Sequence, residues 1–166
     1  MEKYYYGYEE FLSDIEKLSG MIADTDTDTI VAIARGGLTP AHFIAEALDT
    51  HRLYVLNSIH YEDTEKLDTI DVFNIPDLSD AKEVLVVDDI IDSGDTIVEV
   101  LDRLRREYPS VKFRTAALFY KKSASIQPDF SVKEADRWID FLWTADTMAF
   151  GLNNLRSQNE KKEISK

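Results

Sequence analysis

The sequence of 166 residues contains no cysteine, which excludes a disulfide framework, a thiolate zinc site and a cysteine nucleophile. It also has no uninterrupted apolar run of the ~20 residues that a membrane-spanning helix needs. The N-terminus, MEKYYYGYEEF, lacks the basic region and the apolar core of a signal peptide. We therefore expect a cytoplasmic protein without a membrane span.

Basic residues are scarce, with 19 Lys and Arg against 32 Asp and Glu and a formal net charge of −13 at pH 7. Such a surface repels nucleic acid and anionic membranes, so no nucleic-acid partner is expected. An anionic substrate must then be bound by local groups, such as helix N-termini, a few basic side chains or a metal ion. The length fits one domain, which we expect over residues 1–150, followed by a polar C-terminal tail over residues 151–166.

Apolar patterns typical of strands and helices alternate along the chain. A helix is expected to begin with Thr39 as its N-cap and Pro40 at its first helical position. This alternation predicts an α/β fold, a mostly parallel twisted sheet with helices on both faces. In such sheets ligands bind outside the carboxyl ends of the strands. Strands are predicted at Ile30–Ala34, Arg52–Ser58, Glu83–Val87 and Val111–Tyr120, and the other helices at Phe11–Ile22 and from Ile97 to near Tyr108.

Residues 59–82 show no sustained period and carry many charges, apart from short hairpin strands suggested around TIDVFNI. An irregular segment of this length in a compact domain is usually a functional loop, so we interpret it as a flexible lid. The alternative is a disordered insertion.

The stretch DSGDT, residues 92–96, lies where a predicted strand gives way to a helix. The first N–H groups of a helix lack intrahelical partners and carry the positive end of its dipole, so this position can bind a phosphate. Ser93 and Thr96 add hydroxyl donors, and Gly94 lets the backbone approach a ligand. Asp95 would repel a phosphate, so we expect its side chain to turn outward.

Asp88 and Asp89 end the preceding predicted strand. Paired carboxylates at this place can accept hydrogen bonds from the vicinal hydroxyls of a sugar, or hold a hydrated magnesium ion that also touches a phosphate. An isolated pair of aspartates more often caps a turn at a strand end. The phosphate site four residues further on favours the binding interpretation here.

The stretch ARGGLTP, residues 34–40, is a second candidate anion loop at the end of an earlier strand. Arg35 supplies a fixed charge, and Gly36 and Gly37 let backbone amides approach a ligand. The following helix points its N-terminus at the same place. Two anion loops on one sheet predict a ligand with phosphates at two ends.

The stretch VLVVDDIIDSGDTI resembles the signature of the type I phosphoribosyltransferases, in which apolar residues precede two acids, two apolar residues and Asp-Ser/Thr-Gly-x-Thr. VAIARGGLTPA is similar to the pyrophosphate loop of that family. LFYKK followed by RWIDFLW resembles the purine-binding part of bacterial xanthine-guanine phosphoribosyltransferases. The resemblance implies the type I fold with a small hood for the base and a lid. It also implies phosphoribosyl transfer to a 6-oxopurine in purine salvage, Mg²⁺ as cofactor, and a homodimer or homotetramer.

The resemblance implies roles for the residues that would hold phosphoribosyl pyrophosphate. Asp88 and Asp89 are expected to bind the ribose hydroxyls, with magnesium beside them. Pyrophosphate is expected to bind to Arg35, Gly36 and Lys66, and the peptide bond that precedes the arginine is often cis in the family. The 5′-phosphate is expected to be surrounded by Asp92, Ser93, Gly94, Asp95 and Thr96.

The resemblance also implies a base site. Asp92 is expected to be catalytic, next to N7 of the base as hydrogen-bond partner or general base. Lys121 would bond the 6-oxo group, Trp138 would stack on the ring, and Ile139 would meet its edge through the backbone. Thr144 stands where the bacterial enzymes carry an acid thought to read the 2-substituent, so the preferred base stays open among hypoxanthine, guanine and xanthine.

Several alternatives remain at this point. The substrate could be another base, and the two tryptophans could simply be core aromatics. The same fold also serves as a nucleotide sensor in some transcriptional regulators, although these usually need a basic face or an added DNA-binding domain. A magnesium-dependent phosphatase or phospho-receiver domain would place its acceptor aspartate at an early strand end, where this chain has Arg35 and Ser58.

Overall fold

The structure, a computed structural model, describes residues 3–61 and 69–144 and is built on a six-stranded sheet. The strand order is β4-β3-β2-β5-β6-β7, with β4 antiparallel to β3 and every other pair parallel. The predicted mostly parallel sheet is therefore confirmed. Its strands are β2 (Thr29–Ala34), β3 (Leu53–Tyr61), β4 (Thr69–Phe73), β5 (Glu83–Ile91), β6 (Lys112–Tyr120) and β7 (Phe130–Glu134).

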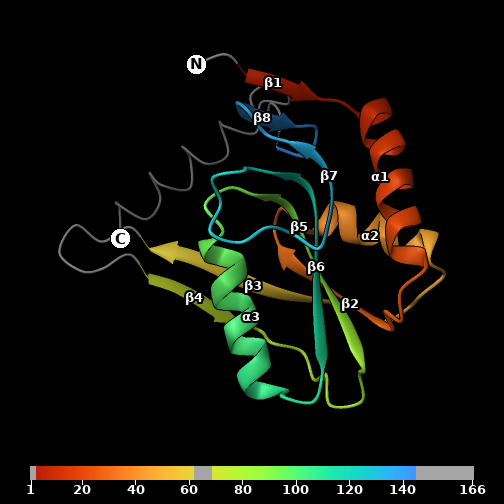
Figure 1. The fold of residues 1–166 in the computed structure, drawn as a ribbon, viewed down its shortest axis with the longest axis vertical. Coiled ribbons are helices and arrows are strands. Elements are labelled where there is room, and N and C mark those ends of the chain that lie inside the picture. Colours follow the sequence, from red (N-terminus) through yellow and green to blue (C-terminus); the bar gives the residue numbers. More distant parts are fainter. Residues whose placement is uncertain (1–2, 62–68, 145–166) are drawn as a thin grey trace, which may run out of the picture.

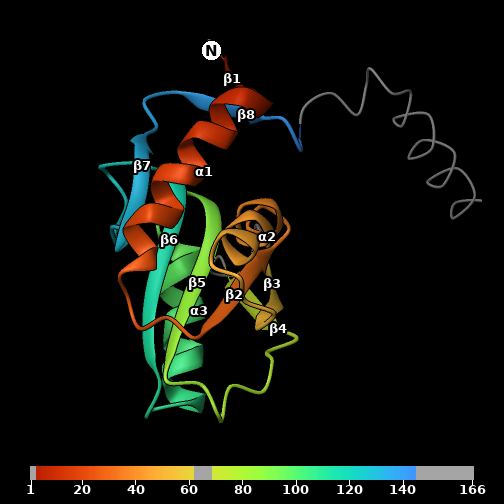
Figure 2. The ribbon, with the colours of Figure 1, turned by 90° about the vertical axis from the view of Figure 1, so that its right-hand side faces the viewer.

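Helices cover both faces of this sheet, as Figures 1 and 2 show. On one face α2 (Leu38–Ala47) packs over β2 and β5 and α1 (Tyr8–Ala23) over β6 and β7, and on the other face lies α3 (Asp95–Glu107). The first half of β5 is buried on both faces because apolar side chains from the two helical layers meet it there. No helix in the described part of the chain combines the length and apolarity that crossing a bilayer requires.

A second, two-stranded parallel sheet joins the two ends of the described chain. It consists of β1 (Lys3–Tyr6) and β8 (Trp138–Phe141). In Figure 1 it lies at the top of the view, beyond the end toward which β6 runs. Tyr6 is fully buried against Phe119 and Phe141, with ring centroids 4.9 and 5.8 Å away. These aromatic contacts hold the small sheet against the carboxyl end of the large one.

Helix α2 begins two residues earlier than predicted, so Thr39 is not its N-cap. Gly37 occupies that position, and its N–H donates to the carbonyl of Ile33 at 2.9 Å. Pro40 is then the third helical residue. It is tolerated there because the first four N–H groups of a helix have no intrahelical acceptor.

Strand β5 is longer than predicted, and the two aspartates lie within it rather than at its end. Its ladder with β6 continues to the pair Ile91–Tyr120. The hydrophobic run stops at Val87, but the neighbouring strand still supplies backbone partners for Asp88. The side chains of the aspartates therefore alternate as strand residues, and both are held by the sheet.

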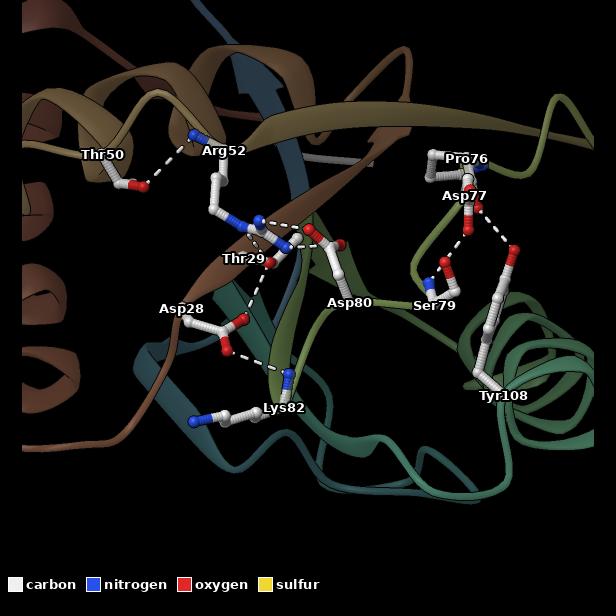
Figure 3. Close-up of polar contacts among 10 residues, drawn as sticks. All are labelled: Asp28, Thr29, Thr50, Arg52, Pro76, Asp77, Ser79, Asp80, Lys82 and Tyr108. Atoms are coloured by element: carbon white, nitrogen blue, oxygen red, sulfur yellow. Dashed lines mark hydrogen bonds and ion pairs between the residues drawn. The ribbon is translucent and has the colours of Figure 1, made fainter.

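Part of the predicted lid is ordered structure. Strand β4 lies inside residues 59–82. Residues 76–82 are held by hydrogen bonds at the amino end of the sheet (Figure 3). Arg52 donates two hydrogen bonds of 3.0 Å to Asp80, and Tyr108 donates to the carbonyl of Pro76 at 3.0 Å. The amino end is opposite to the predicted site, so a lid could include only the earlier part of the segment. Residues 62–68, with Lys66, lie outside the described residues.

Glu83, at the buried start of β5, predicts a pH-dependent stability. It accepts from Lys112 at 2.5 Å and from Arg114 at 2.9 Å. Burial raises its pKa, but the two cations outweigh burial, so the pKa falls below the ordinary 4.5. The ionised carboxylate therefore stabilises the fold above about pH 4.5, and this stabilisation is lost as pH falls through the folded-state pKa.

Glu83→Gln should lower the free energy of unfolding by about 1.5–3 kcal/mol at neutral pH. The difference from the parent chain should shrink as the pH falls below 4.5 and through the lowered folded-state pKa, because the carboxyl protonates there. Urea titrations at neutral pH and at an acidic pH in that range measure this. Glu107→Gln is the control, because its pair with Arg103 is exposed and 3.9 Å long, and it should cost little at either pH. An equal loss from Glu83→Gln at both pH values would contradict the ion-pair explanation.

Candidate active site

Three cavities meet at the carboxyl end of the sheet. The largest, about 960 Å³, lies between the loop after β2, the end of β3 and strand β5. A cavity of about 90 Å³ lies at the start of α3, and one of about 350 Å³ lies under β8. Asp88 and Thr96 line both of the first two, Asp92 and Ile90 line the second and third, and Thr144 lines the first and third. The cavities are thus compartments of one continuous site.

The loop after β2 forms one wall of the large compartment. Arg35 is exposed and lines it together with Gly36, and the peptide bond between Ala34 and Arg35 is cis. A Cβ on Gly36 would lie 2.5 Å from the carboxyl atoms of Asp89. Glycine is therefore needed here because the loop backbone passes directly against a site carboxylate.

The aspartates of β5 form the floor where the large and small compartments join. Asp89 is buried and Asp88 is half-buried. Burial and the neighbouring charge of Asp89 raise the pKa of Asp88 well above its usual range, and burial raises the pKa of Asp89. Two adjacent carboxylates with raised pKa values favour a ligand that brings hydroxyl donors or positive charge.

The start of α3 forms the small compartment. Gly94 caps the helix with φ of 93°, a conformation that favours glycine, and α3 begins at Asp95. Ser93 and Thr96 line the cavity with the free N-terminal end of the helix. The side chain of Asp95 is exposed and accepts a 2.7 Å hydrogen bond from the hydroxyl of Ser93. This agrees with the expected outward turn of Asp95.

Lys121 and Asp92 meet at the mouth of the third compartment, where Lys121 Nζ lies 2.5 Å from Asp92 Oδ1. Their loops are joined through the backbone, because the N–H of Lys121 donates to Ile91 O at 2.9 Å and the N–H of Ser125 donates to Ser93 O at 2.8 Å. A hydrogen-bond donor and an acceptor are thus presented side by side. Lys122 instead pairs with Glu134, away from the cavity.

Strand β8 forms the other wall of the third compartment. Trp138 is 59% exposed, so its indole is a surface on which a flat ligand can stack, whereas Ile139 is buried. Within the described residues β8 pairs with β1 alone, which leaves backbone groups on its other edge free for a ligand. The three predicted base-binding residues, Lys121, Trp138 and Ile139, therefore line one cavity together with Asp92.

Trp143 was not predicted as a site residue, yet it lines the large compartment and its indole N–H donates to Asp89 Oδ2 at 3.2 Å. The signal available in the sequence was weak, since a partly buried indole usually finds an acceptor but the sequence does not name it. Asn57, Ser58 and Ile59 at the end of β3 also line this compartment and were likewise not assigned.

The carboxylates of Asp88 and Asp89 suit a magnesium ion, which binds few protein ligands, better than a metal ion that is coordinated by protein side chains alone. The described residues contain no group of three or more His, Cys, Asp or Glu side chains arranged to hold a metal. Magnesium is commonly bound through one or two carboxylates together with waters and substrate phosphates. Asp88 and Asp89, between two candidate phosphate sites, provide such a pair.

Comparison with known proteins agrees with this geometry. The xanthine-guanine phosphoribosyltransferase of Idiomarina loihiensis is 33% identical over 118 residues, 69% of each chain. The enzyme of that name from Desulfotalea psychrophila is 32% identical over 143 residues, covering 84% of this chain and 85% of its own. The Helicobacter pylori xanthine-guanine-hypoxanthine phosphoribosyltransferase structure superposes with a TM-score of 0.82 at 37% identity, covering 94% of this chain and 99% of the other. The family model of the phosphoribosyl transferase domain matches residues 5–148, and the chain belongs to this family.

Proposed function

We propose that the protein transfers the 5-phosphoribosyl group from phosphoribosyl pyrophosphate to a 6-oxopurine base and releases pyrophosphate. The observation that carries this is the joining of three compartments through shared residues. Each has groups suited to one part of the reacting pair: the helix N-terminus for the 5′-phosphate, the aspartates and the Arg35 loop for ribose and pyrophosphate, and the cavity under β8 for the base. The order along the site brings the base next to the sugar.

In the base compartment, the Lys121 ammonium would donate to the 6-oxo group while Asp92 faces N7 on the same edge of the purine. The two side chains already lie side by side. Trp138 would stack on the ring, and the free backbone edge of β8 at Ile139 would meet its remaining polar edge. Asp92 would then hold or accept the proton at N7 as the new bond to the sugar forms.

Displacement of pyrophosphate places positive charge on the ribose and negative charge on the leaving group. Carboxylates at Asp88 and Asp89 would stabilise the sugar, whereas Arg35 and the amides of its loop would stabilise the pyrophosphate. Magnesium held at the same carboxylates would add neutralisation of the phosphate charge. Both aspartates lie within β5, whose pairing with β6 fixes the backbone that carries them before the substrate arrives.

The proposal also includes a lid over the site, a role for Lys66 and an oligomeric assembly. A segment within residues 59–75 would exclude water, which otherwise hydrolyses the activated sugar. Lys66 on that segment would reach the pyrophosphate. A homodimer or homotetramer is expected and can be measured by light scattering.

The proposal is tested by incubating the chain with magnesium, phosphoribosyl pyrophosphate and each of hypoxanthine, guanine, xanthine, adenine and uracil. Nucleotide formed with one or more of the first three, in amounts equal to the pyrophosphate released, is the expected result. A reaction without base measures hydrolysis of the activated sugar. Failure to form a nucleotide from any of the bases would contradict the enzyme proposal.

A further inference from the structure

Trp143 lies between the strand that carries the base site and the aspartates that would hold the sugar. Its indole Nε1–H donates to Asp89 Oδ2 at 3.2 Å, and its ring lines the large compartment. It thus connects the segment after β8 to the carboxylate pair on β5.

The orientation of the indole is fixed by aromatic packing. Its ring stacks on Phe141 with centroids 4.8 Å apart and planes 15° apart. Tyr6 and Phe11 meet it edge to face at 6.4 and 5.4 Å. The N–H and the hydroxyl of Thr144 both donate to Phe141 O, at 2.9 and 3.0 Å, and close the turn. The indole N–H of Trp143 therefore already points at Asp89, and the ring need not rearrange when a ligand binds.

Asp89 is confined from the opposite side by the loop after β2. The position of a Cβ on Gly36 lies 2.5 Å from Asp89 Cγ and from both carboxylate oxygens. The carboxylate is thus held between the loop backbone and the indole. One oxygen is bonded to Trp143, which fixes the direction in which the other lone pairs face the compartment.

We propose that Trp143 is a positioning residue that holds the carboxylate of Asp89 in the orientation needed to bind magnesium pyrophosphate and the pyrophosphate part of phosphoribosyl pyrophosphate. The inference rests on the proposed function for the identity of this ligand. It goes beyond that function because Trp143, which follows the strand of the base compartment, is assigned to the binding of pyrophosphate. A hydrogen bond from a neutral donor to a carboxylate is strong enough to set such an orientation.

The test is Trp143→Phe in the full chain, which keeps an aromatic ring on Phe141 and removes the N–H. Isothermal titration with magnesium pyrophosphate should show an affinity about tenfold weaker than that of the parent chain. KM for phosphoribosyl pyrophosphate should rise by a similar factor, while KM for the base changes less than twofold. An affinity for magnesium pyrophosphate within twofold of the parent chain would overturn the proposal.

Trp138→Phe is the matched control, because it alters the tryptophan that begins β8 and not the one that bonds to Asp89. It should raise KM for the base and leave the affinity for magnesium pyrophosphate unchanged. A merely structural role for Trp143 predicts that both Michaelis constants change together in Trp143→Phe, which would also overturn the proposal.

Trp138→Phe also allows a fluorescence measurement on Trp143 itself, without a substitution at position 143. The chain has two tryptophans, so Trp143 is the only one left in Trp138→Phe. Saturating magnesium pyrophosphate should alter its fluorescence, and unchanged emission at saturation would contradict contact through Asp89. If the chain forms no nucleotide from any base, the proposed function fails, and the pyrophosphate titrations still decide the role of Trp143.

Discussion

Replacing Asp92 with asparagine is expected to lower kcat by about 10²–10⁴-fold, the usual contribution of a positioned acid or base. Asparagine keeps the shape and can still accept a hydrogen bond from N7–H through Oδ1, but it cannot take up the proton. KM for phosphoribosyl pyrophosphate should change little, because the sugar is held by Asp88 and Asp89 and by the loop after β2. Steady-state kinetics with the preferred base and varied phosphoribosyl pyrophosphate separate the two effects.

Asp95→Asn is the matched control, because it removes a carboxylate from the same loop. Asp95 is exposed, and its side chain is bonded to Ser93 and is not part of the base compartment. Its replacement should leave kcat within about threefold, since removing one hydrogen bond between exposed groups costs little. Unchanged turnover in Asp92→Asn would remove Asp92 from the mechanism.

Gly36→Ala should weaken binding of phosphoribosyl pyrophosphate by about 30- to 100-fold, or roughly 2–3 kcal/mol. The added methyl group would occupy the space of the Asp89 carboxyl, so this buried side chain must move. Movement breaks its bond with Trp143 and misplaces the acid relative to Arg35. The dissociation constant for magnesium pyrophosphate, measured by calorimetry, checks the prediction.

Gly20→Ala provides the comparison for Gly36→Ala. A Cβ at Gly20 meets no atom within 4 Å, and the residue lies on the exposed side of α1. Alanine there should raise the free energy of unfolding by about 0.5–1 kcal/mol through helix propensity and leave binding unchanged. If Gly36→Ala binds magnesium pyrophosphate as the parent chain does, the close approach to Asp89 has no functional consequence.

The elements with strong local patterns were predictable, and those defined by distant partners were not. Strand β5 and helix α3 follow from a continuous apolar run and from regularly spaced apolar residues. Strand β1 has four residues and forms because Lys3 to Tyr6 pair with Trp138 to Phe141, at the other end of the described chain. Strand β7 is similarly short, and among the described strands its one partner is β6. Local periodicity carries no information about either pairing.

The candidate site likewise has features with a local sequence signal and features that depend on residues far apart in the chain. The two anion loops were predicted from glycine and hydroxyl residues at points where a strand gives way to a helix. The family resemblance assigned them roles, which stay predictions. The bond between Trp143 and Asp89 could not, since it joins residues 54 positions apart through packing of aromatic rings. Lys66 was predicted from the resemblance and stays a prediction.

The pairing of β1 with β8 has a consequence for synthesis of the chain. The six described strands of the large sheet end by Glu134, whereas the wall of the base compartment needs both Lys3–Tyr6 and Trp138–Phe141. Lys3–Tyr6 is synthesised long before Trp138–Phe141, so its hydrogen bonds within this sheet can form only after the later strand has been made. We expect nascent chains that end near residue 134 to contain the phosphate-binding half of the site while the base compartment is still absent.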